Sequence, residues 1–154
     1  MPSIDLAPGA EDNGLAAMLA DLVRQNLEAK PHKLADFDAL DGTVAIVADD
    51  ADVCLTMRFV RGGAGRGGSL TIHDGIVGVP DVAIRGTSDM IITLSNMPLS
   101  TPLGLPLPDP RDKEAVATAR TVMDAMRKKE FEMHGALFHP GLVMRLTRVM
   151  SING

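Results

Sequence analysis

The chain lacks tryptophan and tyrosine, and its aromatic content is limited to four phenylalanines among 154 residues. It has a single cysteine, Cys54, which excludes an intramolecular disulfide and a zinc site built from several cysteines. It also lacks a basic excess, because 15 Lys and Arg face 20 Asp and Glu, for a formal net charge of −5. This balance is atypical of nucleic-acid-binding proteins and polybasic membrane anchors, so we expect no nucleic-acid partner.

Long apolar runs are also absent. No stretch reaches the roughly 18 apolar residues that a transmembrane helix needs, so we expect no stable membrane insertion. The start, "MPSIDLAPGA", has neither the basic residues nor the long apolar core of a secretory signal, and the final "SING" does not resemble the peroxisomal tripeptide. Together with the lone cysteine, these features favour a cytoplasmic protein.

Helical periodicity is present in several segments. Apolar residues recur at helical spacing from Leu15 to Leu27, with Asp12 or Asn13 placed to cap the helix and Pro31 placed to end it. Further helices are predicted over residues 88–96, 112–128 and 141–150. The last of these has a broad apolar face, whereas the helix at 112–128 has a narrow apolar stripe typical of a surface helix.

Alternation of apolar and polar residues predicts five strands, around residues 44–46, 53–59, 70–72, 82–84 and 131–133. Each strand has one apolar face and one wettable face, as in a sheet that is covered by helices on a single side. We therefore predict an α/β fold, a two-layer sandwich with a five-stranded, mostly antiparallel sheet.

One domain is expected, because the length and the 45% hydrophobic content suit a single core. Residues 1–11 are predicted to be a flexible N-terminus, and residues 12–154 to form the domain. Within it, residues 98–129 combine an extended connector with an additional helix, since five of the ten prolines lie between Pro98 and Pro110.

No residue pattern identifies a catalytic or metal site. The run "RGGAGRGG" (61–68) is followed by a strand and not by the helix of a phosphate-binding loop, so a hairpin connection is favoured over an anion site. No two histidines have the spacing of a helical zinc motif, and no Gly-x-Ser-x-Gly elbow is present. Cys54 lies on the polar side of its strand, where an unreactive surface thiol is the simpler interpretation. We expect no cofactor and no metal.

Methionine is abundant, with ten residues. Several methionines lie on elements that should face one another across the sandwich. The flexible thioether adapts to ligands of variable shape, although methionine at helical spacing is more often ordinary core.

The order of these elements, with the stretches "LDGTVAIVADD", "VCLTMRF", "VPDVAIRGTSDMIITL" and "KEFEMHGALFHPGLVMRLTRVM", resembles the sterol carrier protein type 2 (SCP-2-like) family over residues 15–150. The resemblance is most specific at Pro80-Asp81-Val82, at the Gly86–Asp89 turn into a helix, and at the final strand with Gly135 and the apolar helix that follows. It implies a non-enzymatic domain with a hydrophobic cavity between sheet and helices. The implied ligand is a sterol, fatty acid, fatty acyl-CoA or phospholipid, and the implied roles are to bind it and, as a further expectation, to transfer it.

The resemblance also implies which residues bind the ligand. The sheet would contribute inward-facing side chains, the helix that follows Gly86-Thr87-Ser88-Asp89 would line the tunnel, and the last helix would form the lid. The predicted ligand-binding residues are Leu55, Met57, Phe59, Met90, Ile91, Leu94, Phe131, Met133, Leu142, Leu146 and Met150.

Two alternatives remain at this stage. One is a protein-interaction or dimerisation module of the same fold with a filled cavity, in which the helix at 112–128 occupies the cavity or contacts a second copy in a homodimer. The other is a small enzyme that uses His134, His73 or Asp81 near the cavity mouth as acid or base. The carrier is favoured over both.

Overall fold

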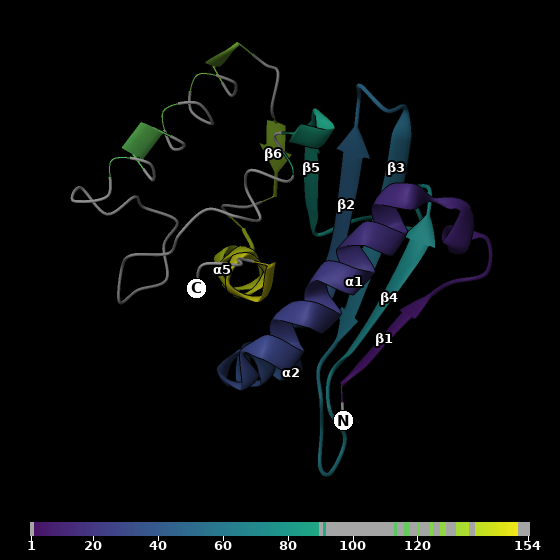
Figure 1. The fold of residues 1–154 in the computed structure, drawn as a ribbon, viewed down its shortest axis with the longest axis vertical. Helices are drawn as coiled ribbons and strands as arrows, with labels where there is room; N and C mark the ends of the chain where they lie inside the picture. Colours follow the sequence, from purple (N-terminus) through teal and green to yellow (C-terminus); the bar gives the residue numbers. More distant parts are fainter. Residues whose placement is uncertain are drawn as a thin grey trace.

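The protein is represented by a computed structural model. It describes residues 2–89, 91, 113, 116, 117, 120, 124, 127, 128, 132–135 and 138–150. These residues form two layers, one a sheet and the other a group of three helices on one face of that sheet (Figure 1). The helices are α1 (Gly14–Ala29), α2 (Leu34–Ala39) and α5 (Pro140–Met150).

The sheet is mixed and, within the described residues, has six strands in the order β1-β4-β3-β2-β5-β6. The pairs β2–β3, β3–β4 and β5–β6 are antiparallel, whereas β1–β4 and β2–β5 are parallel. The strands are β1 (Ser3–Leu6), β2 (Gly42–Ala48), β3 (Val53–Val60), β4 (Ser69–Asp74), β5 (Val82–Gly86) and β6 (Glu132–His134).

The α/β sandwich is confirmed, but the prediction of five strands in a mostly antiparallel sheet is corrected. The additional strand, β1, lies within the segment predicted to be a flexible N-terminus. It pairs in parallel with β4, from Ser3 opposite Ser69 to Leu6 opposite Ile72. Only two apolar residues alternate in these four positions, which is too short a pattern to recognise in the sequence.

Helix α1 begins and ends where the sequence predicts. The side-chain oxygen of Asn13 accepts a hydrogen bond from the Ala16 amide at 3.1 Å, which satisfies one of the amides left unpaired at a helix start. The helix stops at Ala29, and Pro31 begins a short 3-10 helix, Pro31–Lys33, that leads into α2. The predicted C-terminal helix is also confirmed, as α5.

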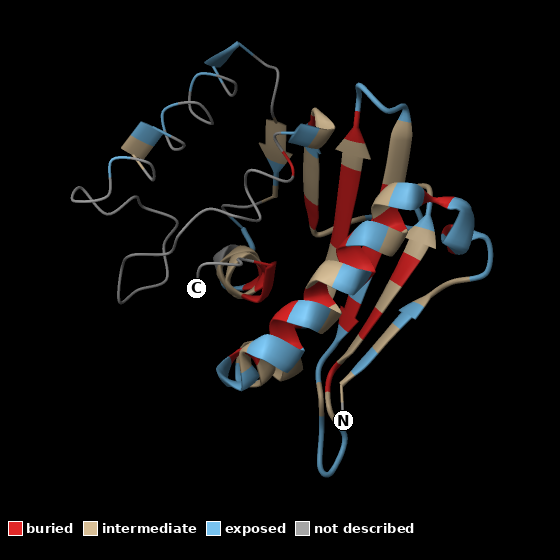
Figure 2. Ribbon diagram, in the orientation of Figure 1, coloured by how far each residue is buried: buried red, intermediate tan, exposed pale blue. Residues whose placement is uncertain are grey.

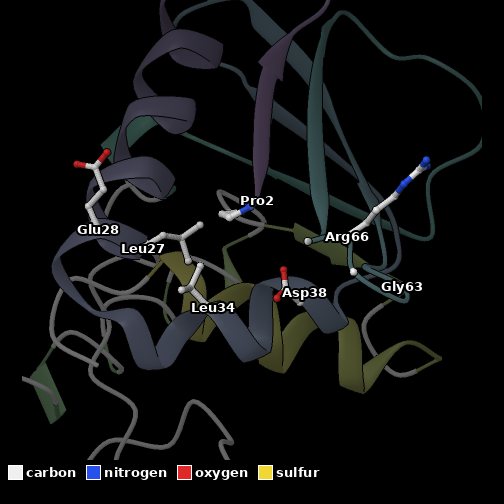
Figure 3. A pocket seen from close by; sticks show the side chains of 9 residues that line it. Pro2, Leu27, Glu28, Leu34, Asp38, Gly63 and Arg66 are labelled. Atoms are coloured by element: carbon white, nitrogen blue, oxygen red, sulfur yellow. The ribbon is translucent and has the colours of Figure 1, made fainter.

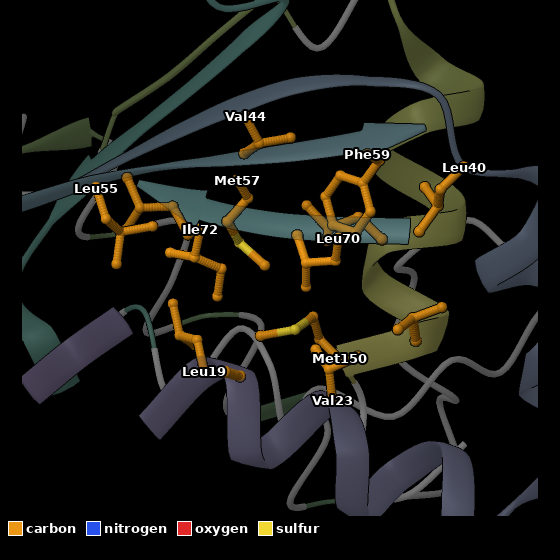
Figure 4. Close-up of a cluster of buried hydrophobic side chains, with 14 of the residues drawn as sticks. Leu19, Val23, Leu40, Val44, Leu55, Met57, Phe59, Leu70, Ile72 and Met150 are labelled. Atoms are coloured by element: carbon orange, nitrogen blue, oxygen red, sulfur yellow. The ribbon is translucent and has the colours of Figure 1, made fainter. Parts of the chain in front are cut away.

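The core lies between the sheet and the three helices. The buried residues of α1 form a stripe that faces the sheet (Figure 2). In β3, Leu55, Met57 and Phe59 are buried, whereas Arg58 and Val60 are exposed. Thr56 is also buried, and its hydroxyl donates to the Gly75 carbonyl at 2.8 Å. Figure 4 shows side chains from β2, β3 and β4 meeting those of α1 and α5 in one apolar cluster. The predicted apolar face of this strand is therefore confirmed, whereas its other face is wettable at Arg58 but buried at Thr56.

Helix α5 is fastened to α1 by a buried amide. The side-chain Nδ2 of Asn26 donates to the main-chain oxygens of Val149, at 3.0 Å, and of Met150, at 2.9 Å. These carbonyls belong to the last turn of α5, where no partner within the helix is available. An ion pair of 3.3 Å between Arg148 and Asp36 links α5 to α2 as well.

Candidate functional site

The predicted ligand-binding residues that the structure describes all lie in or against the apolar core. Leu55, Met57 and Phe59 come from β3, and Leu142, Leu146 and Met150 come from one face of α5. Ile91 belongs to the same cluster, and Met133 of β6 packs against it. The structure thus brings together residues from four parts of the sequence that the resemblance placed around one ligand. Met90, Leu94 and Phe131 lie outside the described residues.

These side chains are closely packed against one another. Leu55 and Met57 have no exposed surface, Phe59 is 2% exposed, and the α5 residues are at most 9% exposed. A ligand among them must therefore displace or separate core side chains. Met57, Met133 and Met150 can adjust with least cost, because an unbranched thioether changes conformation more easily than a branched side chain.

The turn that precedes Ile91 is held by a carboxylate from the β2–β3 turn. Asp50 Oδ1 accepts a hydrogen bond from the Ser88 amide at 2.8 Å and another from the Ser88 hydroxyl at 3.0 Å. The Ser88 amide lowers the pKa of Asp50 below its usual value, since a carboxylate accepts this bond better than the neutral acid does. The Thr87 carbonyl accepts from the Ile91 amide at 3.1 Å, so a helical turn begins here, as predicted.

A cavity of about 620 Å³ lies at another place, between α1, α2 and the β3–β4 hairpin. It was not predicted from the sequence. It is lined by Pro2, Leu27, Glu28, Leu34, Asp38, Gly63, Gly65, Arg66 and Gly67. In Figure 3 the side chains of Leu27 and Leu34 converge below Pro2, and the carboxylate of Asp38 rises beside them. Glu28 and Arg66 extend away from this centre on opposite sides.

The hairpin that closes one side of the cavity is the glycine-rich run 61–68. Gly63 and Arg66 exchange two main-chain hydrogen bonds, of 3.1 and 2.7 Å, across a tight turn. A Cβ atom on Gly68 would lie 2.9 Å from both the Phe37 carbonyl oxygen and Asp38 Cα. Glycine at position 68 therefore allows the hairpin to approach α2 closely, which gives this part of the run a structural role.

Asp38 joins the same hairpin to α2. Its Oδ1 atom accepts from the Gly68 amide at 2.7 Å, and its main-chain oxygen accepts from the Gly62 amide at 2.9 Å. The predicted hairpin is thus confirmed. The two contacts at its base set the position of one wall of the cavity relative to α2.

Leu27 forms the wall between the cavity and the core. This residue is 6% exposed and belongs to the buried cluster, yet it also lines the cavity. Leu34, the other leucine of the lining, packs against the cluster from its edge. An apolar molecule in the cavity would therefore contact the same apolar layer that holds the predicted ligand-binding residues.

The polar residues considered for catalysis do not form one site. His73 is on β4 and His134 on β6, with β3, β2 and β5 between them in the sheet. His134 contacts Glu132 at 3.3 Å, and Asp81 is 3.9 Å from His139. Among the described residues, no group of three or more His, Cys, Asp or Glu side chains could hold a metal ion.

One lysine is unusual for its burial. The Lys33 side chain, at the start of α2, is 1% exposed. Burial lowers the pKa of Lys33 from 10.5 to about 8, and the neighbouring positive charge of Lys30 contributes in the same direction. Lys33 is not part of the cavity lining.

Comparisons with known proteins bear on the fold. No protein-family model matches the chain, and no curated protein matches it. Among solved structures, the chain is similar to a UbiJ-SCP2 ubiquinone synthesis protein, with a TM-score of 0.52 and 13% identity over 90% of this chain and 94% of that chain. Identity at this level bears on the fold alone. The chain thus has an SCP2-like fold, which confirms the resemblance at that level.

Within the part of the chain that the structure describes, no helix is long and apolar enough to cross a membrane.

Proposed function

We propose that this protein binds an apolar small molecule of the lipid class between its sheet and its helices, and that it catalyses no reaction. The observation that carries the proposal is the cavity of about 620 Å³ that meets the apolar core at Leu27, within an SCP2-like fold. Cavities of about 300–1,000 Å³ are typical of small-molecule sites. Sterols, fatty acids, fatty acyl-CoA and phospholipids are the candidate ligands, and transfer between membranes is a candidate role.

The energetics are adequate for binding without specific polar contacts. Burying about 400 Å² of an acyl chain at about 25 cal/mol/Å² contributes about 10 kcal/mol. Association and ordering of the ligand cost about 4 kcal/mol or more, which leaves about 6 kcal/mol and an affinity of tens of micromolar.

The ligand is proposed to extend from the cavity into the apolar core, among the predicted ligand-binding residues. Its inner end would lie against Met57 of β3 and against Met150 of α5, which are both buried in the cluster. Leu142 and Leu146 would remain on the inner face of α5, which acts as the lid. Because the core is packed in this structure, α5 must shift outward for the apolar end to enter.

Native mass spectrometry of freshly purified protein, followed by organic extraction, tests the proposal. A lipid or other apolar species at about one equivalent supports it and identifies the ligand class. The opposing result is a ligand-free protein that also fails to take up 1-decanol or a fluorescent fatty acid at micromolar concentrations.

A second candidate is an interaction or homodimerisation module of the same fold. The observation that favours it is the close packing of Leu55, Met57 and Phe59, which have at most 2% exposed surface. In this case size-exclusion chromatography with light scattering detects a stable dimer, and the dimer persists after lipid extraction. A monomer that binds 1-decanol supports the carrier instead.

A further inference from the structure

The cavity beside the glycine-rich hairpin carries an inference about the polar end of the ligand, and this inference rests on the proposed function. We propose that the cavity selects an amphiphile whose polar end donates hydrogen bonds, such as an alcohol or a primary ammonium, and that it discriminates against a fatty-acid anion. The acceptor is the carboxylate of Asp38, and the apolar part lies on Leu27 and Leu34.

The charges that line the cavity oppose an anion. Glu28 and Asp38 supply two negative charges and Arg66 supplies one positive charge. Arg66 is on the exposed hairpin, and its side chain extends away from the centre of the cavity (Figure 3). In Figure 3 the carboxylate of Asp38 lies beside the converging leucines and that of Glu28 points away from them, so an anionic head group beside Asp38 would meet a like charge.

Asp38 retains the capacity to accept a hydrogen bond. Its Oδ1 atom accepts from the Gly68 amide at 2.7 Å, which fixes the orientation of the carboxylate. The described residues provide no hydrogen-bond donor to its Oδ2 atom. An ionised carboxylate accepts several hydrogen bonds, so Oδ2 can receive one from a ligand hydroxyl or ammonium.

The apolar side of the cavity is placed to hold the rest of such a molecule. Pro2 lies across from Leu27 and Leu34, and both leucines contact the buried cluster. A molecule with its donor on Asp38 therefore has its hydrocarbon part directed along Leu27 toward the core. Glycines 63, 65 and 67 add main-chain surface without side chains that would fill the cavity.

The experiment compares three ligands of one chain length, namely 1-decanol, decylammonium and decanoate, by calorimetric titration at pH 7. We expect decanol and decylammonium to bind about tenfold or more tightly than decanoate, because hydrogen bonds to a charged group are among the stronger ones. In the variant Asp38→Asn, the affinity for decylammonium falls about tenfold and the preference over decanoate disappears. Asparagine keeps a side-chain oxygen for the Gly68 amide, so the hairpin should stay in place.

The matched control is Asp41→Asn. It removes the same charge from an exposed position just beyond α2, outside the cavity lining, and should leave the ranking of the three ligands unchanged. Backbone amide spectra of the full chain locate the site, since bound decylammonium should shift the signals of Gly63, Gly65 and Gly67.

Each outcome is decisive. If the unchanged protein binds decanoate as tightly as decylammonium or more tightly, the inference is overturned and the proposed function stands. The same conclusion follows if decylammonium binds but does not shift the signals of the three glycines. If none of the three ligands binds, the proposed function and this inference fail together.

Discussion

The attachment of α5 to α1 through Asn26 allows a quantitative test of how α5, the proposed lid, is held in place. Replacing Asn26 with alanine removes two hydrogen bonds, to the Val149 and Met150 carbonyls, from a residue that is 6% exposed. Each bond contributes about 1 kcal/mol net, and a buried carbonyl left unsatisfied costs about 1–3 kcal/mol. We therefore expect Asn26→Ala to lower the free energy of unfolding by about 2–3 kcal/mol.

Urea unfolding and thermal melting measure this loss, and for a chain of this size it corresponds to a decrease in Tm of about 4–12 °C. The control is Gln25→Ala, at an exposed position of the same helix, which should change the free energy by less than about 0.5 kcal/mol. Hydrogen exchange should show the loss of protection concentrated in α5. If Asn26→Ala is as stable as Gln25→Ala, these two bonds do not hold the helix.

A charged variant tests the same contact by its pH dependence. In Asn26→Asp, a carboxylate would face the carbonyl oxygens at the negative end of α5, with no donor to offer them. The pKa of the introduced acid is expected to rise on folding, so the variant should gain stability relative to Asn26→Ala as the pH falls. A variant whose stability relative to Asn26→Ala does not change with pH contradicts this reasoning.

Three further predictions concern other parts of the chain. The pKa of Asp50 is lowered from 3.8 on folding, so the ionised carboxylate stabilises the folded protein above pH 3.8, and this stabilisation is lost as the pH falls through the folded pKa. Hydrogen exchange of the Ser88 amide should speed up over the same pH range. In Asp50→Ala this pH dependence of the Ser88 exchange should disappear. Gly68→Ala should lower the free energy of unfolding in urea by more than about 1 kcal/mol, because the added Cβ would lie 2.9 Å from the backbone of α2. The control Gly63→Ala should have little effect, because a Cβ there would have no neighbouring atom within 4 Å. The pKa of Lys33 is lowered from 10.5 to about 8 on folding, so the free energy of unfolding should increase as the pH is raised from about 8 to 10.5. The increase should be smaller in Lys33→Met. An identical increase in the variant would contradict the lowered pKa of Lys33.

The sequence was sufficient to predict the elements that are long or regular. The alternation from Val53 to Phe59 and the helical spacing from Leu15 to Leu27 each extend over enough residues to distinguish strand from helix. The shortest elements were missed. Strand β1 offers two apolar positions and α2 is six residues long, so neither completes a recognisable period. Their positions depend on tertiary contacts, since β1 forms by pairing with β4 and α2 lies between α5 and the hairpin.

The candidate site was predictable only in part. Leu142 and Leu146 could be assigned to an inward face because a helix presents positions four apart on one side, and the structure places both in the core. The cavity was not foreseen, because it joins Pro2, the end of α1, α2 and a hairpin that are distant in sequence. The only signal was the glycine cluster at 61–68, and spacing alone does not reveal that Gly68 is required for close approach to Asp38.

Methionine methyl groups labelled with ¹³C test most directly whether an apolar ligand lies between the sheet and the helices. Met57 and Met150 are buried in the apolar cluster, whereas Met18, at 41% exposure, serves as an external reference. Titration with 1-decanol should shift the Met57 and Met150 signals, saturate at one equivalent and leave Met18 unchanged. Saturable binding that moves neither buried methyl group, or no binding at all, would contradict the account.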